Sequence, residues 1–128
     1  MDVKLDKWYR PKIDKEVLKE LTRKSDAKGL LHVSIYFVFL SLVGCLAYFT
    51  WGTWWAVFWF YIYGNIFCFC NPIWHETGHK TAFKSKLLNE IFYYISSYMA
   101  NFEPTRWRYT HFVHHGNTYS TENPFDHE

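Results

Sequence analysis

The chain has little cysteine, and the cysteines it has form no framework. Only Cys45, Cys68 and Cys70 occur among 128 residues, all in apolar sequence and without a C-x-x-C pair. An odd number in that setting predicts reduced packing residues and argues against a disulfide-stapled fold or a zinc knuckle. The formal net charge of +2 is too small to predict nucleic-acid binding. The first thirty residues are mostly polar, which does not fit a secretory signal peptide.

Charge is also missing from the middle of the chain. Residues 30–50 and 54–73 contain no Asp, Glu, Lys or Arg. About twenty helical residues span roughly 30 Å, the thickness of a hydrocarbon core. Trp51, Trp54 and Trp55 lie at the junction of the two stretches, as in an interfacial aromatic belt. We therefore predict an all-α integral membrane protein built on one transmembrane hairpin, rather than a buried soluble hairpin.

The basic residues predict how this hairpin is oriented. Nine Lys and Arg residues precede it and five follow it, whereas the turn between the two stretches has none. The positive-inside rule then places both ends on the cytoplasmic side, in a bacterial inner membrane or the endoplasmic reticulum. Lys84, Arg106 and Arg108 are interpreted as ordinary flanking charge of this kind.

Three further helices are expected outside the hairpin. Residues 1–29 form a cytoplasmic segment with an amphipathic helix over 14–24. Residues 87–99 are apolar but too short to span, which predicts an interfacial helix in which Asn89 and Glu90 interrupt the apolar run. Residues 105–115 form another helix, ended by Gly116-Asn117. Trp74 and Trp107 are expected at the membrane interface.

Five of the seven histidines fall into two groups at helical spacing. His75 and His79 are four positions apart, and His111, His114 and His115 follow at offsets of three and four. Each offset of three or four places the imidazoles on one helical face. Neutral imidazoles bind iron, zinc and copper, and a cage of them needs at least two converging helices. His114 and His115 point about 100° apart, which suggests a centre with two metal ions.

Two motif interpretations compete for the first group. His75-Glu76-Thr77-Gly78-His79 matches H-E-x-x-H, in which Glu76 would be the general base of a membrane zinc metalloprotease. That interpretation needs only one further ligand, so it does not explain why the second group has three histidines.

The second interpretation uses both groups. H-x-x-x-H after a transmembrane hairpin, followed by H-x-x-H-H, resembles the first two histidine boxes of the membrane fatty acid desaturase and hydroxylase superfamily. The surrounding sequences WHETGHKTAFKS and EPTRWRYTHFVHHGNT are similar to that family over roughly residues 30–128. The resemblance implies two non-haem iron ions bound by the five histidines. It also implies a lipid acyl substrate, O₂, and an electron donor of the ferredoxin or cytochrome b5 type. The three-residue gap in the first box resembles acyl-lipid and sphingolipid desaturases more than acyl-CoA Δ9 enzymes, and a lipid or alkane hydroxylase stays open.

The family also has a third histidine box after a second pair of spans. Residues 1–128 contain no such segment, so we expect an N-terminal fragment that is inactive alone, with domains 1–29 and 30–128 and histidine boxes at 75–79 and 111–115. Glu76, Asn101 and Asp126 are candidate acceptors for the outer N–H groups of ligand histidines.

Overall fold

The computed structural model describes residues 12–116, and this part of the chain is all helical. Its six helices are α1 (Lys15–Leu21), α2 (Asp26–Phe49), α3 (Trp54–Phe67), α4 (Cys70–Gly78), α5 (Lys86–Ala100) and α6 (Pro104–Gly116). The predicted all-α class is confirmed. The helices expected at 14–24, 87–99 and 105–115 are present as α1, α5 and α6, with ends shifted by one to three residues.

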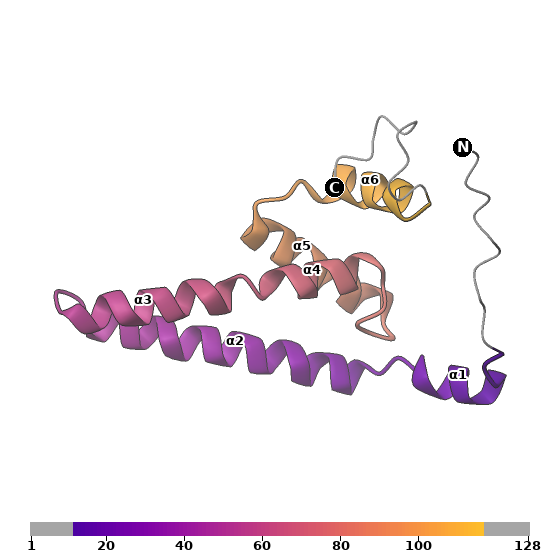
Figure 1. The fold of residues 1–128 in the computed structure, drawn as a ribbon, viewed down its shortest axis with the longest axis horizontal. Coiled ribbons are helices and arrows are strands. Elements are labelled where there is room, and N and C mark those ends of the chain that lie inside the picture. Colours follow the sequence, from indigo (N-terminus) through magenta and orange to yellow (C-terminus); the bar gives the residue numbers. More distant parts are fainter. Residues whose placement is uncertain (1–11, 117–128) are drawn as a thin grey trace, which may run out of the picture.

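The longest helices, α2 and α3, form an antiparallel hairpin whose tip extends away from the other elements (Figure 1). Gly52 takes a left-handed φ of 82° in the tight turn, a conformation that favours glycine. Two helical segments, Lys15–Phe49 and Trp54–Gly78, are long and apolar enough to cross a membrane. They contain α2 and α3, so the predicted hairpin is present.

The hairpin is packed by a small core near its open end. Tyr36, Leu40 and Cys70 are buried together, and aromatic and aliphatic side chains of α3 lie against them. The Tyr36 hydroxyl donates a hydrogen bond to the Phe67 carbonyl at 3.2 Å. All three cysteines are free thiols.

The second apolar stretch is interrupted between α3 and α4. Pro72 has no N–H, so it cannot donate to the carbonyl of Cys68 four residues earlier. Asn71 N–H donates to that carbonyl instead, at 3.1 Å, in a tighter turn. The helix therefore resumes at Cys70, close to the restart that Asn71-Pro72 predicts, and α4 carries the first histidine group.

Beyond the hairpin, α4 packs along α5, and α6 lies on the far side of α5 from α2 in the view of Figure 1. The loop between α4 and α5 is held by Asn89, which is 1% exposed. Its amide donates to the carbonyls of Phe83 and Ser85 at 2.9 and 2.8 Å and accepts from Phe83 N–H at 3.3 Å. Asp26 Oδ1 accepts from Ser85 N–H at 2.7 Å, which ties the same loop to the start of α2. Asn89 is thus an internal anchor and leaves α5 unbroken.

Candidate metal centre

The first two histidines of the site come from α4 and its C-terminal end: His75 lies in the helix and His79 is its C-cap residue. His75 and His79 are one turn apart, and their ring centroids are 4.7 Å apart. The helix ends directly after them: Lys80 takes a left-handed φ of 59°, and Thr81 N–H donates back to the Glu76 carbonyl at 3.0 Å. This type of C-terminal cap turns the chain away immediately after His79, so its imidazole stands at the open end of the helix.

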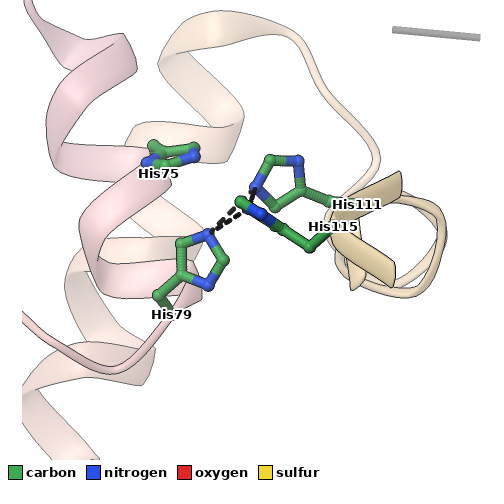
Figure 2. A group of neighbouring side chains, drawn as sticks. All are labelled: His75, His79, His111 and His115. Atoms are coloured by element: carbon green, nitrogen blue, oxygen red, sulfur yellow. Dashed lines mark hydrogen bonds between the residues drawn. The ribbon is translucent and has the colours of Figure 1, made fainter. Parts of the chain in front are cut away.

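The other two histidines lie on α6. Pro104 starts this helix, and the Glu103 carboxylate accepts hydrogen bonds from the backbone N–H groups of Thr105 and Arg106. His111 and His115 are one turn apart on the face directed at α4. Figure 2 shows the two pairs of imidazoles facing into the same space from their separate helices.

Four imidazoles converge in this space. The ligand nitrogens of His75, His79, His111 and His115 all lie within 4.8 Å of one another. Three of them form a close triangle: Nε2 of His79 lies 3.0 Å from that of His111 and 3.2 Å from that of His115, and the last two are 3.0 Å apart. His111 is 7% exposed, whereas His115 is exposed. The convergence of separate helices that the two sequence groups predict is therefore present.

Hydrogen bonding alone cannot satisfy this triangle. In a neutral imidazole each nitrogen is either a donor or an acceptor. Among three mutually close nitrogens, at least one pair must therefore be two donors or two acceptors. A shared cation removes the conflict, because all three Nε2 atoms can then present lone pairs to it.

The spacing also fits one metal ion. Two nitrogens bound at about 2.1 Å, with an angle of roughly 90–110° between them, lie roughly 3.0–3.4 Å apart. The three measured separations of 3.0, 3.0 and 3.2 Å fall in this range. Imidazole is a borderline ligand suited to iron, zinc, copper and nickel. The donor set thus fits a transition metal, and His79, His111 and His115 would hold it, with His75 beside them.

His114 is the one predicted ligand outside this group. Its ring centroid lies 6.1 Å from that of His111 and 6.0 Å from that of His115. Adjacent helical residues point about 100° apart, so His114 cannot face the same point as His115. Its role as a metal ligand stays a prediction.

The surroundings of His79 favour its metal-binding form. Burial lowers the pKa of His79, and the nearby His75, His111 and His115 lower it further against a small opposing effect of Glu76. A lowered pKa favours the neutral imidazole, which is the form that binds metal.

Two tryptophans form a wall of the site, and their expected place at the membrane interface stays a prediction. Trp107 stacks on His111 with ring centroids 4.3 Å apart and an interplanar angle of 17°. Trp74 lies against Trp107 at 3.7 Å and stacks on Phe102 at 4.5 Å. Trp74 is only 7% exposed. The tertiary packing of α4 against α6 accounts for both positions.

Gly78 allows this close approach. A Cβ built there would lie 2.9 Å from Trp107 Cζ3 and 3.1 Å from Tyr93 Cε2. Any larger residue would push the Trp107 ring, and with it His111, away from α4. In the sequence, Gly78 is visible only as a glycine between the two histidines of the first group. The structure shows that it makes room for the rings of Trp107 and Tyr93.

A charged pair fixes α6 on α5. Both terminal nitrogens of Arg108 donate to Glu90 Oε2 at 3.1 Å, and the guanidinium lies 4.1 Å above the Tyr93 ring. The Tyr93 hydroxyl donates to the Pro104 carbonyl, and burial raises the pKa of this phenol. Burial alone would raise the pKa of Glu90, but Arg108 and Lys80 outweigh it and hold that pKa below its ordinary value. Arg108 is therefore an internal tie, in contrast to the flanking charge expected from sequence.

Three residues were predicted to accept hydrogen bonds from the outer N–H groups of the ligand histidines: Glu76, Asn101 and Asp126. Glu76 Oε2 accepts from the Thr81 hydroxyl at 2.6 Å, and its carboxylate is not in the metal-ligand group of the described residues. Asn101 caps the end of α5 with a left-handed φ of 57°. Asp126 lies outside the described residues.

In the described residues, fold and site together give a helical protein with two candidate membrane spans and an imidazole cluster suited to a metal ion at the open end of its hairpin. A sequence profile described as fatty acid desaturase matches residues 49–128, a range that includes all four clustered histidines. The chain belongs to the fatty acid desaturase family. This membership implies an oxidoreductase that uses O₂ on a fatty acyl substrate. No curated protein and no solved structure matches the chain.

Proposed function

We propose that this chain carries two histidine clusters of an acyl-lipid desaturase that introduces a double bond at a centre with two iron ions. One observation carries the proposal: imidazoles from two helices, 32 to 40 residues apart in sequence, meet with three nitrogens at 3.0–3.2 Å. The family match over residues 49–128 supports it independently.

The number of ligands bears on the iron content. His79, His111 and His115 suffice for one face of an ion, with His75 adjacent. His114 is proposed as a ligand of the second ion, because it projects from the same turn of α6 in another direction. Five imidazoles are too few for two irons, so further ligands come from outside the described residues. We expect residues 1–128 alone to give no product.

The position of the site suits a lipid substrate. His75 and His79 lie at the end of α4, which follows the second apolar helix of the hairpin after the interruption between α3 and α4 (Figure 1). An acyl chain can therefore approach along the aromatic surface of α3 without leaving the membrane. Bound iron would supply O₂ activation, and the protein positions the methylene groups and excludes water. The distribution of basic residues supports a cytoplasmic location for the site.

The electron donor is proposed to be a ferredoxin or a cytochrome b5 type protein. These donors are soluble or have soluble domains, so a site on the cytoplasmic side is accessible to them. Glu90 neutralises Arg108 internally, which leaves the exposed Arg106 to meet an acidic donor.

The test is lipid analysis after expression of the complete open reading frame that contains this chain. We expect a new unsaturated fatty acid, absent in His79→Ala and His114→Ala variants. His32→Ala is the matched control, since His32 is not in the metal-ligand group of the described residues, and should retain the product. Retained product in both of the first two variants would reject the proposal. A hydroxylated lipid as the main product would instead assign the alternative hydroxylase activity.

A further inference from the structure

A cavity separate from the histidine cluster opens where the α1–α2 junction meets α4. Its volume is about 390 Å³, and none of the four clustered histidines lines it. The lining combines two kinds of residue. Arg23, Lys24 and Lys28 supply positive charge, whereas Val33 and Ile73 supply an apolar surface.

The same basic residues also border a larger neighbouring cleft. It has a volume of about 920 Å³, and Lys84 joins Arg23, Lys24 and Lys28 along it. Lys24 Nζ donates to the Lys80 carbonyl at 2.7 Å, so this ammonium is fixed to the loop after α4. Arg23, Lys28 and Lys84 are exposed and have no carboxylate within 4.0 Å in the described part of the chain. Three cations are therefore available to an external anion.

Three carboxylates face these cations. Glu20 and Asp26 line the larger cleft, and Glu76 lines the smaller cavity together with His32. Asp26 accepts from Ser85 N–H at 2.7 Å and Glu76 accepts from the Thr81 hydroxyl at 2.6 Å. Both of these carboxylates are oriented by the loop between α4 and α5 but keep their charge. The two cavities together therefore place four basic groups against three carboxylates, an excess of one positive charge.

The cavity lies where α2 changes from a charged to an apolar surface. Lys28 is the last charged residue of α2, and exposed Leu30 and Leu31 begin the apolar surface of the span. The basic lining therefore lies at the level of lipid headgroups, and Val33 lies one turn deeper. This polarity is that of a phospholipid, with an anionic phosphate outside and hydrocarbon inside.

We propose that the α1–α2 junction binds the phosphate-bearing headgroup of an anionic phospholipid. Arg23, Lys28 and Lys84 contact the phosphate, and the start of the acyl chains lies against Val33 and Ile73. Such a lipid would fix α2 relative to the loop that follows His79. This binding does not depend on metal at the histidine cluster, and its failure would leave the proposed oxidoreductase function untouched.

The experiment is native mass spectrometry of the detergent-purified protein with added phosphatidylglycerol or phosphatidylcholine. We expect one phosphatidylglycerol to be retained in preference to phosphatidylcholine. The variant Arg23→Gln/Lys28→Gln/Lys84→Gln should bind it on the order of 100-fold more weakly, since each basic residue near an anionic surface contributes about a fivefold factor. Lys24 is left intact because its hydrogen bond supports the loop.

The matched control is Lys12→Gln/Lys15→Gln/Lys19→Gln, which removes the same charge from residues that line neither cavity. It should keep the preference for phosphatidylglycerol. Equal loss in both triple variants would show a net-charge effect and overturn the site, as would an unchanged preference in the first variant. A separate experiment uses inorganic phosphate as the ligand. If the protein binds inorganic phosphate but not phosphatidylglycerol, the proposed lipid site is wrong and the ligand is soluble phosphate.

Discussion

The two ends of the molecule are stabilised in different ways. At the tip of the hairpin, Phe49 is 81% and Trp54 is 89% exposed. At the other end, Thr77, Asn89, Ser96 and Ser97 are polar and almost fully buried. The hairpin presents a non-directional apolar surface that a lipid environment covers. The histidine end depends on directional hydrogen bonds and close ring packing, so substitutions of the same kind should have different effects in the two regions.

The largest difference is expected between two asparagines. Asn89→Leu removes the buried amide that satisfies three backbone groups of Phe83 and Ser85. Leaving them unpaired should lower the free energy of unfolding by about 3 kcal/mol or more. Asn65, on the exposed surface of α3, donates only to the Tyr61 carbonyl of its own helix. Asn65→Leu should change the stability by less than about 1 kcal/mol. Thermal unfolding in detergent compares the two, and equal effects would contradict the distinction.

A pair of glycines tests ring packing at the site. Gly78→Ala brings a methyl group within 2.9 Å of Trp107 and should destabilise by about 1–3 kcal/mol while weakening metal binding. Gly64→Ala meets nothing within 4 Å in the described residues and should stabilise the helix by roughly 0.5–1 kcal/mol. Unfolding curves and metal titration of both variants give the answer. A Gly78→Ala protein with unchanged metal affinity would disprove the role of close packing.

The smallest effect concerns pH. Because the pKa of Glu90 is lowered in the folded protein, its pair with Arg108 contributes stability above the unfolded pKa of about 4.3. This contribution is lost as the pH falls through the lower folded value. Glu90→Gln should remove it, an effect of about 1 kcal/mol or less. Unfolding measured from pH 7 to pH 3 should show a shallower loss of stability in Glu90→Gln than in the wild type. Parallel curves of stability against pH for the two proteins would refute the contribution of the Glu90–Arg108 pair.

The sequence predicted those features that depend on short-range pattern. Two uncharged stretches predicted the hairpin, the offset of four predicted that His75 pairs with His79, and offsets of three and four predicted that His111, His114 and His115 form a second group. The sequence could not predict which side of α6 faces α4, so it could not tell which of His114 and His115 joins His111 beside α4. Trp107 stacks on His111 only because Gly78 is opposite it, a contact between residues 29 positions apart. Asn89 looked like an interruption, since its partners depend on how the loop folds back.

The most direct test of the shared metal centre is iron content. The complete protein should be purified, loaded anaerobically with Fe(II), and its bound iron measured by mass spectrometry for the wild type, His79→Ala, His111→Ala and the control His32→Ala. We predict bound iron in the wild type and His32→Ala and loss of most of it in both cluster variants. A wild type without iron, or cluster variants that bind as much iron as the control, would contradict a centre built jointly by α4 and α6.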